Sequence, residues 1–296
     1  MGRPGLYHGI QITDSGIREP GFVYGRYVLK DELSRAEHGG IDQGRYRSGS
    51  LHTGEGLFVT GPEVSAIIPV FNDRPSLEIA LKASLETLSG ITREFEILVA
   101  EDGSTDGSTG VVRQYEAQDN RVRLLHHDES QGRGRALNRA IRESRGTIVC
   151  YYDVDLATDM KHLPALISAI REGSDISIGS RLLPASDIVR TEGREIASRS
   201  YNFLVRLFLG SRIYDHQCGF KAFRRERILP LLPLIQSNHW FWDTEILVRA
   251  QRNGSRVHEF PVRWRAGKGT TVKIKDVFEM GSSILRLWWQ IHVSKN

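Results

Sequence analysis

Two carboxylates follow an apolar run near the middle of the chain. The run 147–150 (Thr-Ile-Val-Cys) leads through Tyr151 and Tyr152 to Asp153 and Asp155, which stand one residue apart. Open α/β sheets bind ligands at the carboxyl ends of their strands, so charge at this point indicates a binding site. An Asp-x-Asp pair there can hold Mg²⁺ or Mn²⁺, hard cations that favour oxygen ligands and bridge to phosphates. A solvated acidic turn is the alternative that the pair by itself leaves open.

Two further polar clusters follow earlier apolar runs. One is Pro69-Val70-Phe71-Asn72-Asp73, and the other is Glu101-Asp102-Gly103-Ser104-Thr105-Asp106-Gly107-Ser108. Each cluster alone is compatible with ordinary turn chemistry, because Asp, Asn, Gly and Ser are common turn residues. Three such clusters after successive strands instead indicate a nucleotide-diphosphate site that includes a metal ion.

The elements between these clusters alternate in type. Apolar strand patterns occupy 65–70, 95–100, 122–125, 147–152 and 175–179, and helical patterns lie between them. This order predicts an α/β fold, a mostly parallel sheet with helices on both faces. Right-handed crossovers place the loops 71–74, 101–108 and 153–158 along one edge of that sheet.

A glycine-rich segment offers another phosphate contact. Gln131-Gly132-Arg133-Gly134-Arg135 precedes a helical pattern, so the helix N-terminus and Arg133 are predicted to meet phosphate. As a Gly-x-Gly-x-x-Gly dinucleotide motif the segment fails, because Leu137 occupies the third glycine position.

Composition narrows the class of protein. The 296 residues are 40% hydrophobic, enough for a full core, and the net charge of +4 is too small to argue for nucleic-acid binding. Cys150 and Cys218 do not suggest a disulfide framework, so we expect a reducing compartment. We also expect neither a signal peptide nor a membrane span, because no run reaches roughly 18 apolar residues.

The motifs together resemble a known family. The segments 70–73, 101–106 and 153–155 resemble the motif series of family 2 glycosyltransferases with a GT-A fold, and the resemblance covers about Val64 to Arg265. The segments 179–181, 215–221 and 241–245 resemble the dolichyl-phosphate (polyprenyl-phosphate) glucosyltransferase and mannosyltransferase branch. The resemblance implies a single α/β GT-A catalytic domain that transfers a sugar from a UDP- or GDP-sugar with inversion. It also implies a divalent cofactor, Mg²⁺ or Mn²⁺.

The resemblance also assigns residues to roles. It implies that the nucleotide sugar is bound by Pro69, Phe71, Asn72, Asp73, Asp102, Ser104, Asp106, Arg133, Asp153 and Lys221. Asp73 departs from the family's usual Glu, with a shorter arm and the same charge. Asp153 and Asp155 are the implied metal ligands, and Asp155 is the more direct of the two.

Three residues are expected at the acceptor side. Arg181 and Arg199 correspond to arginines that hold the acceptor phosphate in the resembling enzymes, and arginine forks suit phosphate. A solvated or salt-bridged arginine is the alternative for either. Asp243 occupies the family's catalytic-base position, although an Asp before a helical pattern can also be an N-cap. A lipid monophosphate, with a second pKa of about 6, needs no base, so with that acceptor Asp243 would orient other groups.

Helical patterns near the acceptor residues and at the C-terminus complete the prediction. Arg199 lies in a helical pattern, 195–209, with Ile196, Phe203, Leu204 and Leu207 on its apolar face. The predicted helix at 273–296 carries Trp288 and Trp289 close to basic residues, which indicates either a membrane-surface anchor or a helix packed on the sheet. We therefore divide the chain into a loosely ordered extension, 1–61, a catalytic domain, 62–272, and an amphipathic helix, 273–296. A lid or an oligomer arm is the alternative for the extension.

The predicted reaction moves a hexose from UDP-glucose or GDP-mannose to a polyprenyl phosphate, at the cytoplasmic face of a membrane. A soluble or polysaccharide hydroxyl acceptor is the first alternative. The second is a nucleotide-sugar-binding protein that has lost catalysis. The sequence leaves the oligomeric state open.

Overall fold

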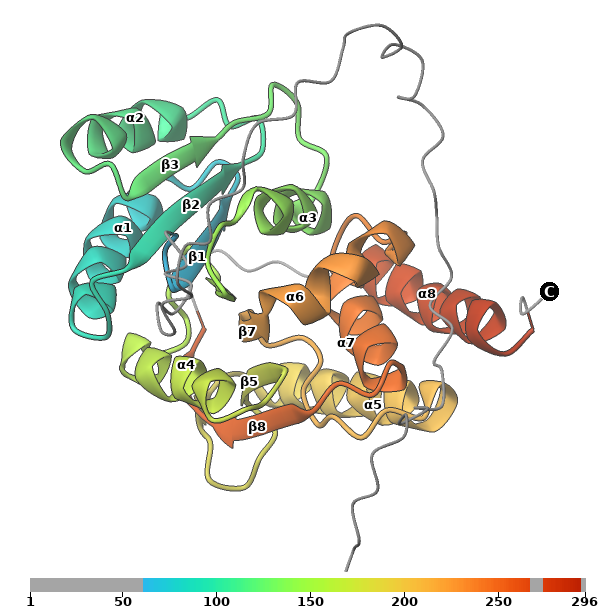
Figure 1. The fold of residues 1–296 in the computed structure, drawn as a ribbon. Coiled ribbons are helices and arrows are strands. Elements are labelled where there is room, and N and C mark those ends of the chain that lie inside the picture. The colour runs from blue at the N-terminus through green and yellow to red at the C-terminus, as the bar shows by residue number, and fades with distance from the viewer. Residues whose placement is uncertain (1–60, 267–273, 294–296) are drawn as a thin grey trace, which may run out of the picture. The chain divides into compact units, whose positions relative to one another are not determined.

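The computed structural model describes residues 61–266 and 274–293, and it describes the side chains of the final helix from residue 279 onward. The predicted extension at 1–61 lies almost wholly outside these residues. Figure 1 shows a central sheet between two layers of helices.

A seven-stranded sheet forms the centre of the described chain, in the order β3-β2-β1-β4-β7-β5-β8. Its strands are β1 (Val64–Val70), β2 (Phe95–Glu101), β3 (Val122–Leu125), β4 (Ile148–Tyr152), β5 (Ile176–Ser180), β7 (Phe220–Arg224) and β8 (Val257–Pro261). All neighbours pair in parallel except β7, which runs antiparallel between β4 and β5. The prediction of a mostly parallel sheet is therefore confirmed, and the five expected strands are present.

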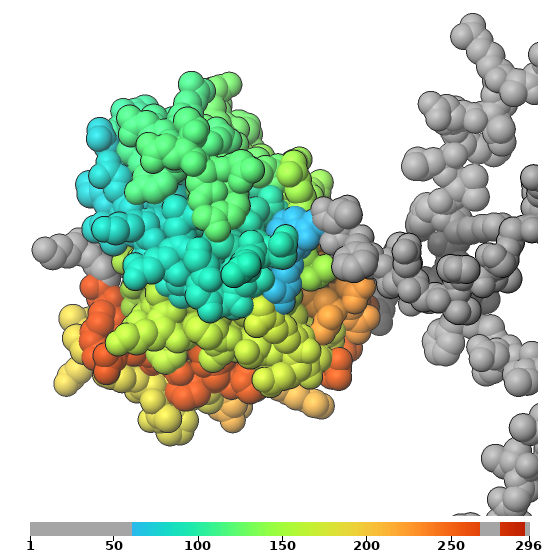
Figure 2. Space-filling model, turned by 60° about the vertical axis from the view of Figure 1, so that its left-hand side comes forward, coloured from blue at the N-terminus to red at the C-terminus, as the bar shows by residue number. Residues whose placement is uncertain are grey.

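Helices cover both faces of the sheet because the strands β1, β2, β4 and β5 are buried along their whole length. One face packs against α1 (Arg74–Ser89), α2 (Ser108–Gln118) and α4 (Leu163–Arg171). In Figure 2 these helices, blue-green to yellow-green, form a continuous layer. The opposite face packs against α3 (Arg133–Glu143), α6 (Arg225–Ile228), the 3₁₀ helix η2 (Leu229–Leu234) and α7 (Trp242–Arg252). A second 3₁₀ helix, η1 (Met160–His162), precedes α4.

A third group of buried apolar residues lies away from the sheet, besides those on its two faces. There α5 (Glu192–Leu209), α7 and α8 (Ile274–His292) pack together through small apolar faces. A short parallel pair, β6 (Asp187–Val189) and β9 (Arg263–Arg265), forms a second sheet. The final helix thus packs on other helices, whereas the sequence predicted that it would pack on the sheet or lie at a membrane surface. No helix in the described ranges combines the length and apolarity that crossing a membrane requires.

The apolar face predicted for α5 is the face turned to solvent. Tyr201, Val205 and Leu209 are the apolar side chains that α5 buries, whereas Ile196 and Phe203 are more than half exposed. Leu204 and Leu207 are exposed as well. Apolar residues surround most of this helix, so periodicity alone could not choose the side that packs.

Candidate active site

The three polar clusters lie at one edge of the sheet, as predicted. They follow β1, β2 and β4, which are parallel neighbours, so their carboxyl ends point the same way. Local backbone geometry shapes two of the loops, since Asn72 and Leu156 have φ values of 52° and 49° in the left-handed region. Such values are uncommon outside glycine and cluster at functional loops.

The first two clusters hold each other in place. The amide of Asn72 donates to Ser104 Oγ (2.9 Å), and Thr105 N donates to Asn72 Oδ1 (2.8 Å). Asp106 in the second cluster accepts from the amide of Arg74, which follows the first cluster (2.8 Å). The side chains of Asn72, Ser104 and Asp106 therefore tie the two loops together, and their predicted contacts with a nucleotide are additional to these bonds.

The other residues of the first cluster differ in exposure. Pro69 is buried in β1, and Phe71 is 52% exposed beside it. Asp73 caps α1, with Oδ1 accepting from Ser76 N (3.3 Å). Phe71 is thus free to contact a ligand at the rim, whereas Asp73 already stabilises a helix.

One carboxylate oxygen of Asp102 accepts three hydrogen bonds, and the other accepts none among the described residues. Its Oδ2 accepts from Ser130 Oγ (3.0 Å) and from the amides of Gln131 and Gly132, both at 2.9 Å. Its Oδ1 is buried and has no hydrogen-bond partner among the described residues. A buried acceptor left unpaired costs free energy, so this oxygen is poised to receive a donor from a ligand.

The glycine-rich segment has a packing role. A Cβ on Gly134 would lie 2.7 Å from Trp242 Cβ, and one on Gly132, whose φ is +99°, would lie 2.5 Å from the His239 ring. The amide of Gly134 donates to Asn238 O (2.7 Å). The amides of Gly134 and Arg135 are thus paired within the protein, and the predicted contact of Arg133 with phosphate stays a prediction. Close packing places Arg133 between β4 and α7.

Asp153 and Asp155 occupy the turn after β4. Asp153 accepts from Arg133 Nη2 (2.8 Å) and Nε (3.2 Å), and Asp155 accepts from Ala157 N (3.1 Å). Burial, followed by the charges of Asp153 and Asp73, raises the pKa of Asp155. The carboxylates of Asp153 and Asp155 are oxygen ligands of the kind that a hard divalent cation prefers, so this pair fits such an ion when substrate phosphates complete its coordination. In the described ranges, no group of three or more His, Cys, Asp or Glu side chains is arranged so that it could hold a metal ion.

The carboxylate of Asp153 packs closely against the backbone of Gly219. A Cβ at Gly219 would stand 1.9 Å from Asp153 Oδ2 and 2.3 Å from its Cγ. The amide of Asp153 also donates to Gly219 O (3.1 Å). Glycine is thus required for the observed position of Asp153, and neither the motif nor the spacing showed this.

A buried ion network surrounds Asp243. Its Oδ1 accepts from Lys221 Nζ (2.6 Å) and from the Tyr151 hydroxyl, and its Oδ2 accepts from Arg133 Nη1 (2.6 Å). Burial alone would raise the pKa of Asp243, but the Lys221 and Arg133 charges outweigh it and lower the pKa. The helix N-cap is Phe241, so Asp243 is not the capping residue. Asp243 is therefore an ionised carboxylate whose side chain is 4% exposed and already accepts hydrogen bonds from three donors.

The network links the predicted metal site to α7. Arg133 bridges Asp153 and Asp243, and its guanidinium lies over the rings of Tyr151 (5.5 Å) and Trp240 (5.8 Å). Lys221 is fully buried and also donates to Cys218 O (2.5 Å). Its predicted contact with the nucleotide stays a prediction, since its ammonium is committed to Asp243. Tyr151 is a member that sequence reasoning missed, although strand alternation next to the Asp pair was a usable signal.

Arg181 and Arg199 have different surroundings. Arg181 forms a bidentate pair with buried Asp215, with Nε–Oδ2 at 2.8 Å and Nη2–Oδ1 at 2.9 Å. Its guanidinium also lies 5.6 Å from the centre of the Trp264 ring. Arg199 is 60% exposed and pairs with Glu195 one turn earlier in α5. The structure thus holds Arg181 rigidly, whereas it brings Arg199 into no contact with the Asp153 or Asp243 clusters.

Comparisons with known proteins agree with this geometry. The family model described as Glycosyl transferase family 2 matches residues 65–229, more than half of the chain. Glycosyltransferase AglD of Haloferax volcanii is 47% identical over 237 residues, 79% of this chain and 38% of AglD. The chain thus spans about two fifths of the length of that relative. The dolichyl-phosphate beta-glucosyltransferase ALG5D of Trichomonas vaginalis is 30% identical over 236 residues, 76% of this chain and 72% of the relative.

Solved structures share the fold. Glucosyl-3-phosphoglycerate synthase of Mycobacterium tuberculosis, solved with Mn²⁺, UDP and glucosyl-3-phosphoglycerate, matches with a TM-score of 0.54 and 17% identity. The match covers 78% of this chain and 80% of the synthase. The mannosyltransferase PcManGT of Pyrobaculum calidifontis, solved with GDP-Man and Mn²⁺, gives 0.53 at 18% identity, over 80% and 66%. The expected GT-A fold is confirmed, and the chain belongs to glycosyl transferase family 2.

Proposed function

We propose that this protein is an inverting hexosyltransferase that moves a sugar from UDP-glucose or GDP-mannose to a polyprenyl phosphate. Membership of family 2 supports the reaction class. The dolichyl-phosphate beta-glucosyltransferases of Trichomonas vaginalis and Drosophila melanogaster, each 30% identical to this chain, support the acceptor and favour glucose as the sugar.

The state of Asp243 is the observation that carries the choice of acceptor. A hydroxyl acceptor needs a general base with a reachable oxygen and a pKa near the working pH. Asp243 offers neither, because Lys221, Arg133 and Tyr151 surround it and its pKa is lowered. A phosphate monoester carries its own nucleophilic oxygen at pH 7, so it reacts without a protein base. We therefore assign Asp243 to positioning Arg133 and Lys221.

The donor would bind along the sheet edge. The unpaired Oδ1 of Asp102 would accept an N–H of the nucleotide base, and Phe71 would cover the base at the rim. Asp153 and Asp155 would hold the divalent cation, which supplies Lewis-acid stabilisation of the diphosphate leaving group. Arg133 lies beside Asp153 and would contact the same diphosphate. The acceptor oxygen forms the new bond at the anomeric carbon on the face opposite to the breaking sugar–diphosphate bond, so the configuration inverts.

Arg181 is the stronger candidate for holding the acceptor phosphate. Its pairing with Asp215 fixes the plane of the fork, while Nη1 makes no hydrogen bond within the described part of the chain. The charge of a guanidinium fork suits a phosphate dianion.

The test is a transfer assay with purified protein, a divalent metal and labelled UDP-glucose or GDP-mannose, with and without polyprenyl phosphate. We expect label in the organic phase only when polyprenyl phosphate is present. Label transferred to a soluble glycan instead would establish the hydroxyl-acceptor alternative. Nucleotide-sugar binding without transfer to either acceptor would show a protein that has lost catalysis.

A further inference from the structure

Trp240 is a large, partly exposed side chain at the edge of the ion network around Asp243. It is 40% exposed, whereas Phe241 and Trp242, which follow it, are buried. The Arg133 guanidinium carbon lies 5.8 Å from the centre of the Trp240 ring. A single exposed apolar side chain is ordinary on a protein surface, but this one borders the residues that would hold the donor.

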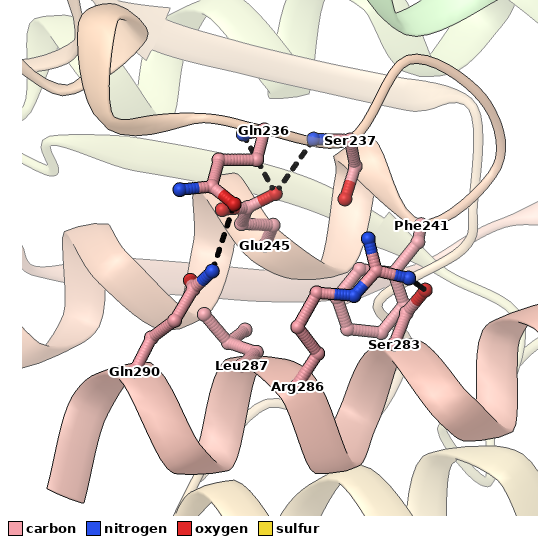
Figure 3. Close-up of a pocket in the computed structure, with 8 residues that line it drawn as sticks. All are labelled: Gln236, Ser237, Phe241, Glu245, Ser283, Arg286, Leu287 and Gln290. Carbon is pink, nitrogen blue, oxygen red and sulfur yellow. Dashed lines mark hydrogen bonds between the residues drawn. The ribbon is translucent and has the colours of Figure 1, made fainter. Parts of the chain in front are cut away.

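The segment that leads to Trp240 is fixed by Glu245. Figure 3 shows the Glu245 carboxylate, which accepts from the amides of Gln236 (3.2 Å) and Ser237 (3.0 Å). The side chain of Gln236 accepts in turn from Gln290 Nε2 of α8 (2.8 Å). This segment is therefore tied to both α7 and α8.

The residues next to Trp240 are held as well. Asn238 O accepts from the amide of Arg135 in α3 (3.3 Å), and Asn238 Oδ1 accepts from Arg135 Nε (2.8 Å). His239 O accepts from the amide of Trp242 at the start of α7 (3.1 Å). Hydrogen bonds thus fix the chain beside Trp240, so a ligand that meets its indole pays little to order the loop.

Arg133 connects Trp240 to the proposed metal ligands. Its Nη2 and Nε donate to Asp153 at 2.8 and 3.2 Å, and its Nη1 donates to Asp243. In the proposed function the diphosphate of the donor lies beside Asp153 and Arg133. A single oxygen joins the anomeric carbon of the hexose to that diphosphate, so the hexose lies next to the groups that border Arg133. Of the two rings near Arg133 in the described chain, Tyr151 is fully buried and Trp240 is exposed.

The indole ring of a tryptophan suits a pyranose. A pyranose carries C–H groups on its faces and hydroxyls around its rim, and weakly positive C–H groups are attracted to the negative face of an aromatic ring. The metal and Arg133 contact a nucleoside diphosphate whether or not it carries a sugar. A stacking contact at Trp240 is available only to the nucleotide sugar.

We propose that Trp240 stacks on the hexose of the donor and makes the site favour the nucleotide sugar over the free nucleoside diphosphate. This inference rests on the proposed function, which supplies the position of the diphosphate. The product diphosphate has lost the hexose and with it the contact to Trp240. Its release is therefore easier than release of the unreacted donor.

The test measures binding by calorimetry in the presence of Mn²⁺ and compares UDP-glucose with UDP, and GDP-mannose with GDP. Trp240→Ala should weaken binding of the preferred nucleotide sugar roughly tenfold and leave binding of its free nucleotide unchanged. Trp240→Phe should keep most of the affinity, because it keeps an aromatic ring. Trp289→Ala is the matched control, since Trp289 is a 59% exposed tryptophan on α8, and it should bind every nucleotide like the wild type. All three variants should keep the wild-type melting temperature.

Other outcomes separate this proposal from its alternatives and from the proposed function. Equal loss of affinity for nucleotide sugar and free nucleotide in Trp240→Ala would overturn it and would assign Trp240 to holding Arg133 against the diphosphate. Wild-type affinity for both would overturn it too, and a raised acceptor KM in that case would place the indole at the acceptor. Selective loss of nucleotide-sugar binding, in a protein whose wild type transfers to no lipid phosphate, would support the stacking contact and defeat the proposed function.

Discussion

Replacing Gly219 by Ala tests whether the position of Asp153 is essential. The added Cβ would stand 1.9 Å from Oδ2, 2.3 Å from Cγ and 2.5 Å from Oδ1 of Asp153. Nonbonded carbon and oxygen atoms do not approach so closely, so the carboxylate must move by about 1 Å or more, away from Arg133 and from the metal position. Misplacement of a reacting or positioning group by about 1 Å can cost roughly 100-fold in rate.

The fold should tolerate this change. The backbone at Gly219 has no left-handed φ, so Ala is allowed there. The Asp153–Arg133 pair is part-buried, and Arg133 keeps its second partner, Asp243, so weakening the pair costs about 1 kcal/mol. The entropic gain from Gly to Ala of about 0.4–1 kcal/mol offsets this cost. We therefore expect transfer to fall roughly 100-fold and Mn²⁺ affinity to weaken, with the free energy of unfolding changed by less than about 1 kcal/mol.

The assay pairs transfer kinetics with calorimetric titration of Mn²⁺ in the presence of UDP, and with urea denaturation. Gly110→Ala is the control, because a Cβ at Gly110 in α2 meets nothing within 4 Å. The control should keep wild-type transfer and metal affinity. If Gly219→Ala also keeps both, the observed position of Asp153 is not required and the argument from close packing at Gly219 is wrong.

Four other changes test the remaining arguments. Asp155→Asn should abolish most transfer and weaken Mn²⁺ binding in calorimetry; full wild-type transfer in excess chelator would contradict the metal assignment. Asp243→Asn should lower the free energy of unfolding in urea by about 3–5 kcal/mol, because it removes the counter-charge from buried cations; loss of transfer with unchanged stability would instead indicate a base. Arg181→Lys should raise the acceptor KM while calorimetry finds unchanged donor affinity, because Lys lacks the fork that pairs with Asp215; reduced donor affinity would move Arg181 to the diphosphate. Burial, opposed by the charge of Asp215, lowers the pKa of His216 to about 3. The contribution of neutral His216 to the free energy of unfolding is therefore fully present above about pH 6.5 and is lost as the pH falls toward about 3, by about 2 kcal/mol at about pH 5. His216→Gln should flatten this pH dependence of the free energy of unfolding in urea melts across that range.

The local sequence pattern alone predicted the strands and their arrangement in a mostly parallel sheet. Short apolar runs with Gly and Asp after them predict strands, and their alternation with helical patterns leaves a parallel sheet as the main solution. The carboxyl-end rule then places Asn72, Asp102 and Asp153 at one edge, because it depends on chain direction and not on side-chain detail. These predictions hold because each depends on neighbours within about ten residues or on topology.

The environment of Asp243 depended on tertiary structure. Arg133, Tyr151, Lys221 and Asp243 come from four separate elements, and only the packing of α3, β4, β7 and α7 brings them within hydrogen-bond distance. Sequence placed Lys221 near phosphate and Asp243 in a base or capping role because an isolated residue shows its charge and not its partners. The antiparallel insertion of β7 between β4 and β5 carries Lys221 into this cluster.

The same limit explains the two exposed helices. Sequence determined that α5 and α8 are helical and rich in apolar residues, since periodicity reports composition around the axis. It did not determine that α5 would bury Tyr201 and Val205 while Phe203 faces outward. That choice depends on which helix surface meets α7 and α8, a matter of shape and of the polar contacts at Gln290 and Tyr201. The sequence therefore determined the elements and the edge of the sheet that carries the chemistry, whereas tertiary packing decided which charges are paired and which apolar faces remain uncovered.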